Sequence, residues 1–335
     1  MRFLFKTVLL LGILALLAAA GYAAWYVETP MPMQKVPAEF EIPPGAGFRT
    51  ATARIEAAGI RVGRREFELL ARWYGRAKDI KAGSYEISAP LTPLAMLDKL
   101  TSGDVTQGEV KFIEGWNIRQ VRAALNANVD LKHETAQLSD TELLQRVGAK
   151  ETHPEGLFFP DTYLFSKGAS DLAVLKRAYA ALQRHLAQEW EARDAQAAPW
   201  ESPYEALIMA SVVEKETGRA AERDRIAGVL VNRLRIGMLL QADPTVIYGL
   251  GASFDGNLRK IHLQTDGPYN TYTRTGLPPT PIAMPGLASI RAALKPAKTD
   301  ALYYVSRGDG TSEFSRSLEE HNRAVRKYQL NASRK

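Results

Sequence analysis

The stretch PYEALIMASVVEKETG, residues 203–218, predicts a helix that ends beside a glutamate in an apolar setting. Glu216 shares one helical face with the apolar residues that precede it by three, four and seven positions, which are Val213, Val212 and Met209. Glu214 lies about 200° away around the same helix axis. We therefore expect that only Glu216 continues the apolar stripe, and that the two carboxylates do not line one cleft.

The end of this helix favours Glu216 as an acid. Thr217 and Gly218 are typical of a helix terminus, where exposed carbonyl groups form the negative pole of the helix dipole. Apolar surroundings and this dipole both disfavour a carboxylate, so the pKa of Glu216 should rise toward the range of a general acid. The alternative is a solvated last-turn glutamate that pairs with Lys215 or with an arginine of AAERDR.

The N-terminus predicts a membrane segment. Arg2 and Lys6 precede an uncharged apolar run, residues 7–27, that is long enough to cross a bilayer. Basic residues on the short side predict that residues 1–6 stay in the cytoplasm while the rest of the chain is exported. AAAGYAA also offers a signal-peptide cleavage site, but the length of the run and the aromatic residues at its end favour a retained anchor.

Composition excludes several classes of protein. The 335 residues contain no cysteine, which rules out disulfides, thiolate metal sites and thiol nucleophiles, and the net charge of +6 suits anionic surroundings. The five histidines lack HExxH spacing, and neither GxSxG, SxxK nor a Walker loop is present. Basic residues are dispersed without a nucleic-acid-binding signature, so no nucleic acid partner is expected.

The remaining chain divides by composition and periodicity into an α+β arrangement. Proline-spaced residues 28–38 predict an extended stalk. In the small α+β module that follows, Thr92 is expected to cap a helix with Pro93 at its first position. The three folded segments are expected to be an α+β module, a connecting helical segment and a helix-rich domain, at residues 39–108, 109–150 and 151–330.

Several linked motifs resemble one known family. ASVVEKETG, ERDRIAGVLVNRLRIGMLLQADPTVIYGLG, YNTYTRTGLPPTPIAMPG and SLEEHN follow one another as they do in the membrane-anchored endolytic murein transglycosylases, the YceG-like family. The similarity extends from about Val36 to Tyr328. It implies an inner-membrane enzyme with a periplasmic, lysozyme-like or YceG-like catalytic domain that cuts nascent peptidoglycan strands without cofactor or metal. The resemblance also implies association with peptidoglycan synthases.

The resemblance carries residue roles onto this chain. It places the catalytic glutamate within EKET, which we assign to Glu216, and it implies substrate contacts in two loops, at Gln241, Asp243, Thr245, Tyr269, Asn270 and Tyr272. Asp243 can also be explained as a helix cap, and the others as loop packing. A second signature, EGLFFPDTY, contains Glu155, Asp161 and Tyr163, for which structural support is the favoured interpretation. His321 and Asn322 belong to the closing motif, whose helix is expected beside the site.

Some details depart from the family pattern. Met284 stands where members often carry Asn, and Ser312 lies where they often carry His, so details of the sugar subsites are less well defined. IKAGSYEIS and LTPLAMLDKLTSGDV are similar to the LysM-like glycan-binding fold of this family, in which Gly83 and Tyr85 fit the turn and strand. This module is expected either to contact glycan or to act as a scaffold.

The expected mechanism needs one carboxylate. Glu216 protonates the leaving oxygen and then removes the proton of the muramic C6 hydroxyl, which closes on C1. One alternative is a hydrolytic muramidase that pairs Glu216 with Glu155, Asp161 or Asp243. The other is a non-catalytic glycan-binding scaffold for cell-wall synthesis.

Overall fold

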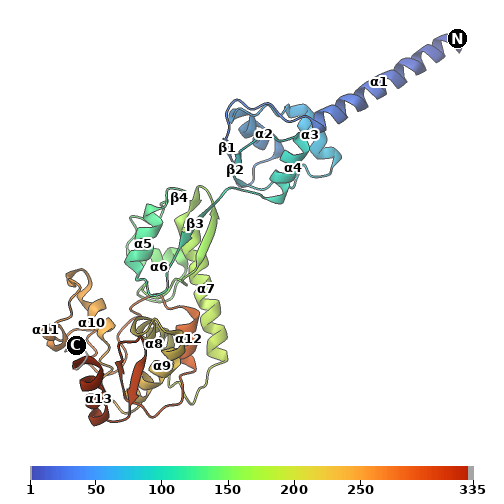
Figure 1. The fold of residues 1–335 in the computed structure, drawn as a ribbon. Coiled ribbons are helices and arrows are strands. Elements are labelled where there is room, and N and C mark those ends of the chain that lie inside the picture. The colour runs from blue at the N-terminus through green and yellow to red at the C-terminus, as the bar shows by residue number, and fades with distance from the viewer. Residues whose placement is uncertain (1, 331–335) are drawn as a thin grey trace. The chain divides into compact units, whose positions relative to one another are not determined.

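The computed structural model describes residues 2–330, which form two compact units (Figure 1). The N-terminal unit runs to residue 108 and includes the short segment 164–169, and the C-terminal unit holds the rest. Residues 109–150 are part of the C-terminal unit rather than a separate connecting segment, because α6 (Asp140–Val147) packs against α7 (Asp171–Glu191). The mixture of helices and short strands is the α+β class expected from the sequence.

Helix α1 (Arg2–Glu28) contains the predicted membrane segment. Its residues Phe5–Glu28 are long and apolar enough to cross a bilayer, and the most apolar window has a mean hydropathy of 2.2 with no residue buried inside the protein. Within residues 2–330 it is the one helix that meets these criteria, which a signal sequence also meets.

The N-terminal unit is built around one antiparallel strand pair. Phe40 and Tyr85 stack across this pair with ring centroids 5.5 Å apart. The cap predicted for the last helix is confirmed, since Thr92 Oγ1 accepts the N–H of Ala95 and Pro93 follows the cap. The elements are β1 (Ala38–Ile42), α2 (Phe48–Ala57), α3 (Arg64–Trp73), β2 (Gly83–Ile87) and α4 (Pro93–Ser102).

The segment expected to be a stalk, residues 28–38, packs onto this unit. Met31 is buried and its N–H donates to Leu91 O at 2.8 Å, while the N–H of Gln34 donates to Gly59 O at 2.9 Å. The prediction of an extended stalk is therefore wrong. Burying an apolar methionine and pairing the backbone N–H groups outweigh the proline spacing that suggested a free segment.

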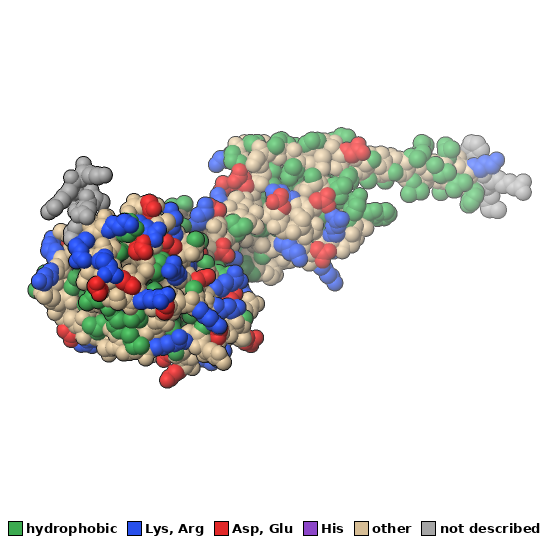
Figure 2. Space-filling model, turned by 60° about the horizontal axis from the view of Figure 1, so that its bottom comes forward, with side chains coloured by type: hydrophobic (Ala, Val, Ile, Leu, Met, Phe, Trp, Pro, Cys, Tyr) green, Lys and Arg blue, Asp and Glu red, His purple; other side chains and the backbone are tan. Residues whose placement is uncertain are grey.

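The C-terminal unit is rich in helices, and all the sheets in the described chain have two strands. In Figure 2 the Lys and Arg side chains on its visible face are interspersed with Asp and Glu, so this face carries no basic stripe. The elements not yet named are β3 (Gln107–Lys111), α5 (Ile118–Ala127), β4 (Leu131–Lys132), β5 (Thr162–Ser166), β6 (Ala169–Ser170), α8 (Pro203–Glu216), α9 (Ala220–Arg235), α10 (Asp243–Leu250), a 3-10 turn (Gly251–Ser253), α11 (Lys260–Gln264), α12 (Leu287–Leu294), β7 (Tyr303–Ser306), β8 (Ser312–Ser315), α13 (Leu318–Val325) and a final π-helical turn (Arg326–Leu330).

Helix α8 is the centre of this unit and packs against α12, α9 and α7 (Figure 1). Ser202 caps its start by accepting the N–H of Glu205, and Pro203 occupies the first position. All eight residues from Ala206 to Val213 are buried, so the helix is enclosed on nearly all sides. The catalytic candidate is thus attached to the core itself.

Candidate active site

Glu216 is the last residue of α8, as the sequence predicts. Thr217 continues in an extended conformation, so the free carbonyls of the helix lie at the same end as the Glu216 carboxyl group. The apolar residues on its helical face, Met209, Val212 and Val213, are fully buried. Glu216 therefore combines apolar neighbours with the negative pole of a helix.

Tyr304 holds one oxygen of this carboxyl group. Its hydroxyl donates to Oε2 of Glu216 at 2.8 Å. Tyr304 lies on β7, directly opposite Phe314 of β8 in the antiparallel register. The other oxygen, Oε1, is buried, and no residue in the described chain donates a hydrogen bond to it. Since an unsatisfied buried oxygen is costly, Oε1 makes Glu216 the candidate for proton exchange with a bound molecule.

The surroundings tune the acidity of Glu216. Burial raises its pKa to about 7, against the lowering effects of the Tyr304 hydrogen bond and of the Arg233 charge, and the negative charge of Asp243 adds to the rise. Burial and the nearby Glu216 also raise the pKa of Tyr304 well above its ordinary value, so this hydroxyl remains a donor. A carboxyl group with a pKa near neutrality can donate a proton and take one back at pH 7.

Arg233 of α9 supplies the positive charge and connects three segments. It is buried, and its Nε donates to Leu302 O while Nη1 donates to Leu240 O, both at 2.7 Å. Nη1 also donates to Oε1 of Gln241 at 3.4 Å, and the guanidinium lies 5.2 Å from the ring centroid of Tyr303. The arginine thereby holds α9, the segment before α10 and strand β7 in one arrangement.

Gln241 and Asp243 lie exposed before and at the start of α10. Among the described non-glycine residues, only Gln241 has a positive φ, 52°, and its N–H donates to Thr271 O at 3.1 Å. The carboxylate of Asp243 accepts a hydrogen bond from the Tyr272 hydroxyl. The alternative explanation of Asp243 as a helix cap is wrong, because Ala242 occupies the cap position of α10 without a side-chain hydrogen bond and the Asp243 carboxylate contacts Tyr272 instead.

Two of the residues predicted to contact substrate are buried and bonded to the protein. Thr245 Oγ1 donates to Ala242 O at 2.7 Å. The side-chain amide of Asn270 donates to Thr265 O at 2.6 Å and, through its carbonyl, accepts the N–H two residues later. Because these polar atoms are engaged, we assign Thr245 and Asn270 to shaping the loops.

Tyr269 and Tyr272 are partly exposed on the proline-rich segment. The Tyr269 hydroxyl shares a hydrogen bond of 2.8 Å with Thr280 Oγ1, and its ring packs edge-to-face on Tyr248 with centroids 4.8 Å apart. The rings of Tyr269 and Tyr272 are therefore held in fixed positions, Tyr272 by its hydrogen bond to Asp243, and part of each ring is left open to a ligand.

Glu214 meets different partners from Glu216, as the helical geometry predicts. Its Oε2 accepts the N–H of Gly286 at 3.0 Å and the hydroxyl of Ser289 at 2.6 Å, and Arg223 lies 3.8 Å from Oε1. Its side chain is only 7% exposed. The two carboxylates thus contact different partners, and Glu214 is enclosed as well, because α8 is packed on nearly all sides.

Comparison with known proteins identifies the relationship. The sequence model of the YceG-like family matches residues 40–327. The chain belongs to the YceG-like family. An endolytic murein transglycosylase of Bacillus subtilis is 32% identical, over 88% of this chain and 85% of that protein.

More distant relatives agree with this assignment to the YceG-like family. An endolytic murein transglycosylase of Streptococcus pneumoniae serotype 2 is 26% identical over 93% of this chain, which spans 63% of the streptococcal protein. The crystal structure of a YceG-like protein from Listeria monocytogenes superimposes with a TM-score of 0.55 at 28% identity, covering 87% of this chain and 99% of that one.

The second signature of the YceG-like resemblance, EGLFFPDTY, supports the structure around α5. Glu155 is buried; its Oε1 accepts the N–H of Ile118 and its Oε2 accepts the Tyr248 hydroxyl, both at 3.0 Å. Burial raises the pKa of Glu155 to about 7, yet both oxygens are satisfied by the protein. Asp161 and Tyr163 make their hydrogen bonds to neighbours in the same segment.

The closing motif of the resemblance, SLEEHN, lies at the start of α13 beside the site. The ring of His321 stacks on Tyr303 with centroids 5.2 Å apart. Burial and the charge of Arg233 lower the pKa of His321, which keeps this ring neutral at pH 7.

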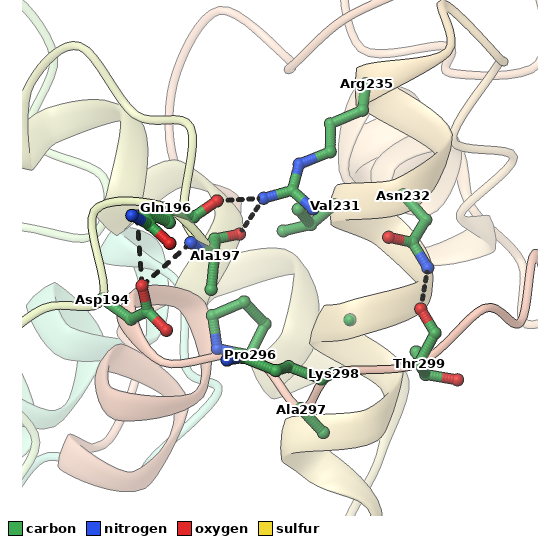
Figure 3. A pocket seen from close by; sticks show the side chains of 11 residues that line it. Asp194, Gln196, Ala197, Val231, Asn232, Arg235, Pro296, Ala297, Lys298 and Thr299 are labelled. Atoms are coloured by element: carbon green, nitrogen blue, oxygen red, sulfur yellow. Dashed lines mark hydrogen bonds between the residues drawn. The ribbon is translucent and has the colours of Figure 1, made fainter.

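A separate hollow of about 270 Å³ in this YceG-like chain lies between α9 and two loops (Figure 3). Asn232 and Arg235 reach toward these loops, and Arg235 donates to the carbonyls of Gln196 and Ala197 at 2.5 and 2.7 Å. Its polar groups are largely used to hold its own walls, and Glu216 does not line it. This hollow is therefore separate from the candidate site at Glu216.

Sequence reasoning missed Tyr304 and Arg233. Arg233 could have been found, because it follows Ile226 by seven positions and Leu230 by three on α9, the same signal that identified Glu216. Tyr304 could not, because adjacent tyrosines at 303 and 304 point to opposite faces of a strand and the sequence does not say which face meets Glu216.

Proposed function

We propose that this protein is an endolytic lytic transglycosylase that cleaves the peptidoglycan bond between N-acetylmuramic acid and N-acetylglucosamine. The relatives named endolytic murein transglycosylases support the reaction class. The observation that carries the residue assignment is the half-satisfied carboxyl group of Glu216, which has one oxygen on Tyr304 and the other free.

The reaction uses Glu216 twice. In its neutral form, Oε1 gives a proton to the glycosidic oxygen as the bond to the muramic C1 breaks. The resulting carboxylate then takes the proton of the muramic C6 hydroxyl, whose oxygen closes on C1 to form a 1,6-anhydro ring. The proton that Glu216 gives to the leaving oxygen is replaced by the proton of the C6 hydroxyl, so Glu216 is neutral again after one cycle and no water is consumed.

The neighbouring residues fit this cycle. Arg233 and the Tyr304 hydroxyl stabilise the carboxylate form, while burial stabilises the neutral form, so neither state is strongly preferred near pH 7. The sugar can contact the amide of Gln241 and the carboxylate of Asp243. Two aromatic ring faces are supplied by Tyr269 and Tyr272. Thr245 and Asn270 hold the loops that present them.

Asp243 is the residue that would serve the alternative function, a hydrolytic muramidase. It is exposed and its charge acts on Glu216, so it is the described carboxylate best placed to activate a water. Its engagement with the Tyr272 hydroxyl favours a binding role.

Helix α1 supports a proposal for the location of the enzyme. We propose a single inner-membrane span with the catalytic unit in the periplasm, where it cuts nascent strands and thereby ends their elongation. The order β1, α2, α3, β2 with paired outer strands supports a LysM-like module that scaffolds or contacts glycan. Peptidoglycan synthases are the proposed protein partners.

Digestion of long uncrosslinked glycan in heavy-oxygen water tests this function. We expect unlabelled 1,6-anhydro ends on internal fragments of mixed length. Labelled reducing ends would establish hydrolysis instead, release of terminal disaccharides alone would contradict the endolytic mode, and binding without cleavage would establish the scaffold.

A further inference from the structure

Helix α3 exposes two large apolar side chains. Leu69 is 66% exposed and Trp73 is 87% exposed, while Phe67 on the opposite side of the helix is completely buried. Leu69 and Trp73 are four residues apart, so they lie next to each other on one face. A tryptophan this exposed is unusual in a folded domain, since Trp is normally largely buried.

The same segment is basic. Residues 64–81 contain six Lys and Arg against three Asp and Glu. Arg65 precedes Leu69 by one helical turn and Arg72 follows it by three residues, so both flank the apolar pair. Basic residues beside exposed Leu and Trp are the composition of helices that lie in the interface of an anionic bilayer.

This face adjoins the base of the membrane segment. Tyr26 of α1 donates its hydroxyl to Val62 O at 2.5 Å, immediately before α3 begins. Glu66 lines a hollow shared with Tyr22 and Trp25 of α1, and it precedes Trp73 by seven residues, which puts both on one side of α3. Figure 1 places α3 at the end of the unit where α1 emerges, and Figure 2 shows hydrophobic side chains beside that point.

We propose that α3 docks the N-terminal unit onto the anionic phospholipid surface, with Leu69 and Trp73 in the headgroup layer and the flanking arginines on lipid phosphates. The proposal rests on the proposed membrane span. Tryptophan suits this layer because its ring is apolar and its N–H is polar. Attachment through α1 keeps the face near the bilayer, so weak individual contacts are enough for binding.

The absence of cysteine permits a direct test on the full chain. Single variants Leu69→Cys, Val129→Cys and Leu11→Cys are spin-labelled and reconstituted in vesicles of phosphatidylglycerol and phosphatidylethanolamine. Accessibility of each label to a water-soluble nickel chelate and to oxygen is then measured. Val129 is the matched surface control, since it is 92% exposed in the C-terminal unit, and Leu11 reports insertion of α1.

We expect accessibility to the nickel chelate to be several-fold lower at position 69 than at position 129. Adding Arg65→Gln to Leu69→Cys should weaken this protection, whereas Arg49→Gln on α2 should not, because Arg49 is exposed but lies on another helix. If the label at position 11 lies in lipid but the labels at positions 69 and 129 are equally accessible to the nickel chelate, the docking proposal is wrong and the membrane span stands.

Two other results would also overturn the docking proposal. A water-accessible label at 11 would remove the span on which it rests, while leaving the glycan-cleavage assay as an independent test of the enzyme. Protection at 69 that occurs in native membranes but not in pure lipid would mean that a protein covers this face.

Discussion

Glu214 and Glu216 lie two residues apart at the end of α8, yet their carboxyl groups differ in how completely the protein satisfies them with hydrogen bonds. Glu214 receives hydrogen bonds from Gly286 and Ser289 and faces Arg223, so its carboxylate is a fixed part of the core. Glu216 has one hydroxyl donor and one free oxygen. Burial is common to both, so the difference that marks a catalytic acid is the incomplete satisfaction of its charge by the protein.

The strongest test of this contrast is Glu216→Gln. Since an amide keeps the shape but cannot cycle a proton, we expect cleavage of glycan strands to fall by about 10³-fold or more. Anhydro-ended products are quantified by mass spectrometry, with circular dichroism as a check on folding. The matched variant Glu214→Gln should keep most of its activity, and a dead Glu214→Gln beside an active Glu216→Gln would reverse the assignment.

The same substitution should change how stability depends on pH. The pKa of Glu216 is about 7 in the folded chain, above its ordinary value of about 4.3, so the folded state binds the proton more tightly. Tighter proton binding by Glu216 therefore contributes fully to the free energy of unfolding below about pH 4.3. This contribution of up to about 3 kcal/mol is lost as the pH rises to about 7. The free energy of unfolding is measured for the unsubstituted protein and for Glu216→Gln. From pH 4 to pH 8 the difference between them should shift in favour of Glu216→Gln. A difference that does not depend on pH would contradict the raised pKa of Glu216.

Glu214 should matter for stability instead. Glu214→Ala leaves the N–H of Gly286 and the hydroxyl of Ser289 without their acceptor and Arg223 without its ion-pair partner, and we expect a loss of about 2 kcal/mol in the free energy of unfolding. Glu214→Gln keeps one acceptor and should lose about half of that. Urea denaturation measures both, and unchanged stability in Glu214→Ala would show that these bonds do not hold α12 to α8.

The smallest expected effect is that of Tyr304→Phe. Its hydrogen bond lowers the pKa of Glu216, so removing it should raise that pKa and move the alkaline limb of the activity profile upward by about 0.5 to 1 pH unit. Initial rates of strand cleavage from pH 5 to 9 give the limb. Tyr303→Phe is the matched control, and an identical shift there would mean that packing rather than the bond to Glu216 is responsible.

The local features of this molecule could be predicted from its sequence. The end of α8, the capped start of α4 and the apolar N-terminal helix follow from periodicity and capping residues over a few turns. Helical geometry also separated Glu214 from Glu216, because their angle around one axis needs no tertiary information.

The contacts that complete the site could not be predicted, because they join distant parts of the chain. Tyr304 reaches Glu216 across 88 residues, and Asp243 meets Tyr272 across 29. For Asp243 the local rule for helix caps gave the wrong partner, since a tertiary hydrogen bond competed with it successfully. The burial of Glu214 was missed for a similar reason, because an apolar stripe shows one packed face and not how many neighbours enclose the helix.

The enclosure of α8 has a consequence for how the active site tolerates motion. Amide protons of Ala206–Val213 lie in the buried stretch of α8, so their hydrogen exchange should require cooperative opening of the whole C-terminal unit. The loop that carries Tyr272 has no regular secondary structure and can open at lower free energy. The proposed proton donor, Glu216, thus follows directly on a segment that we expect to exchange slowly, while the loop that carries Tyr272 should exchange faster and open more readily to a glycan strand.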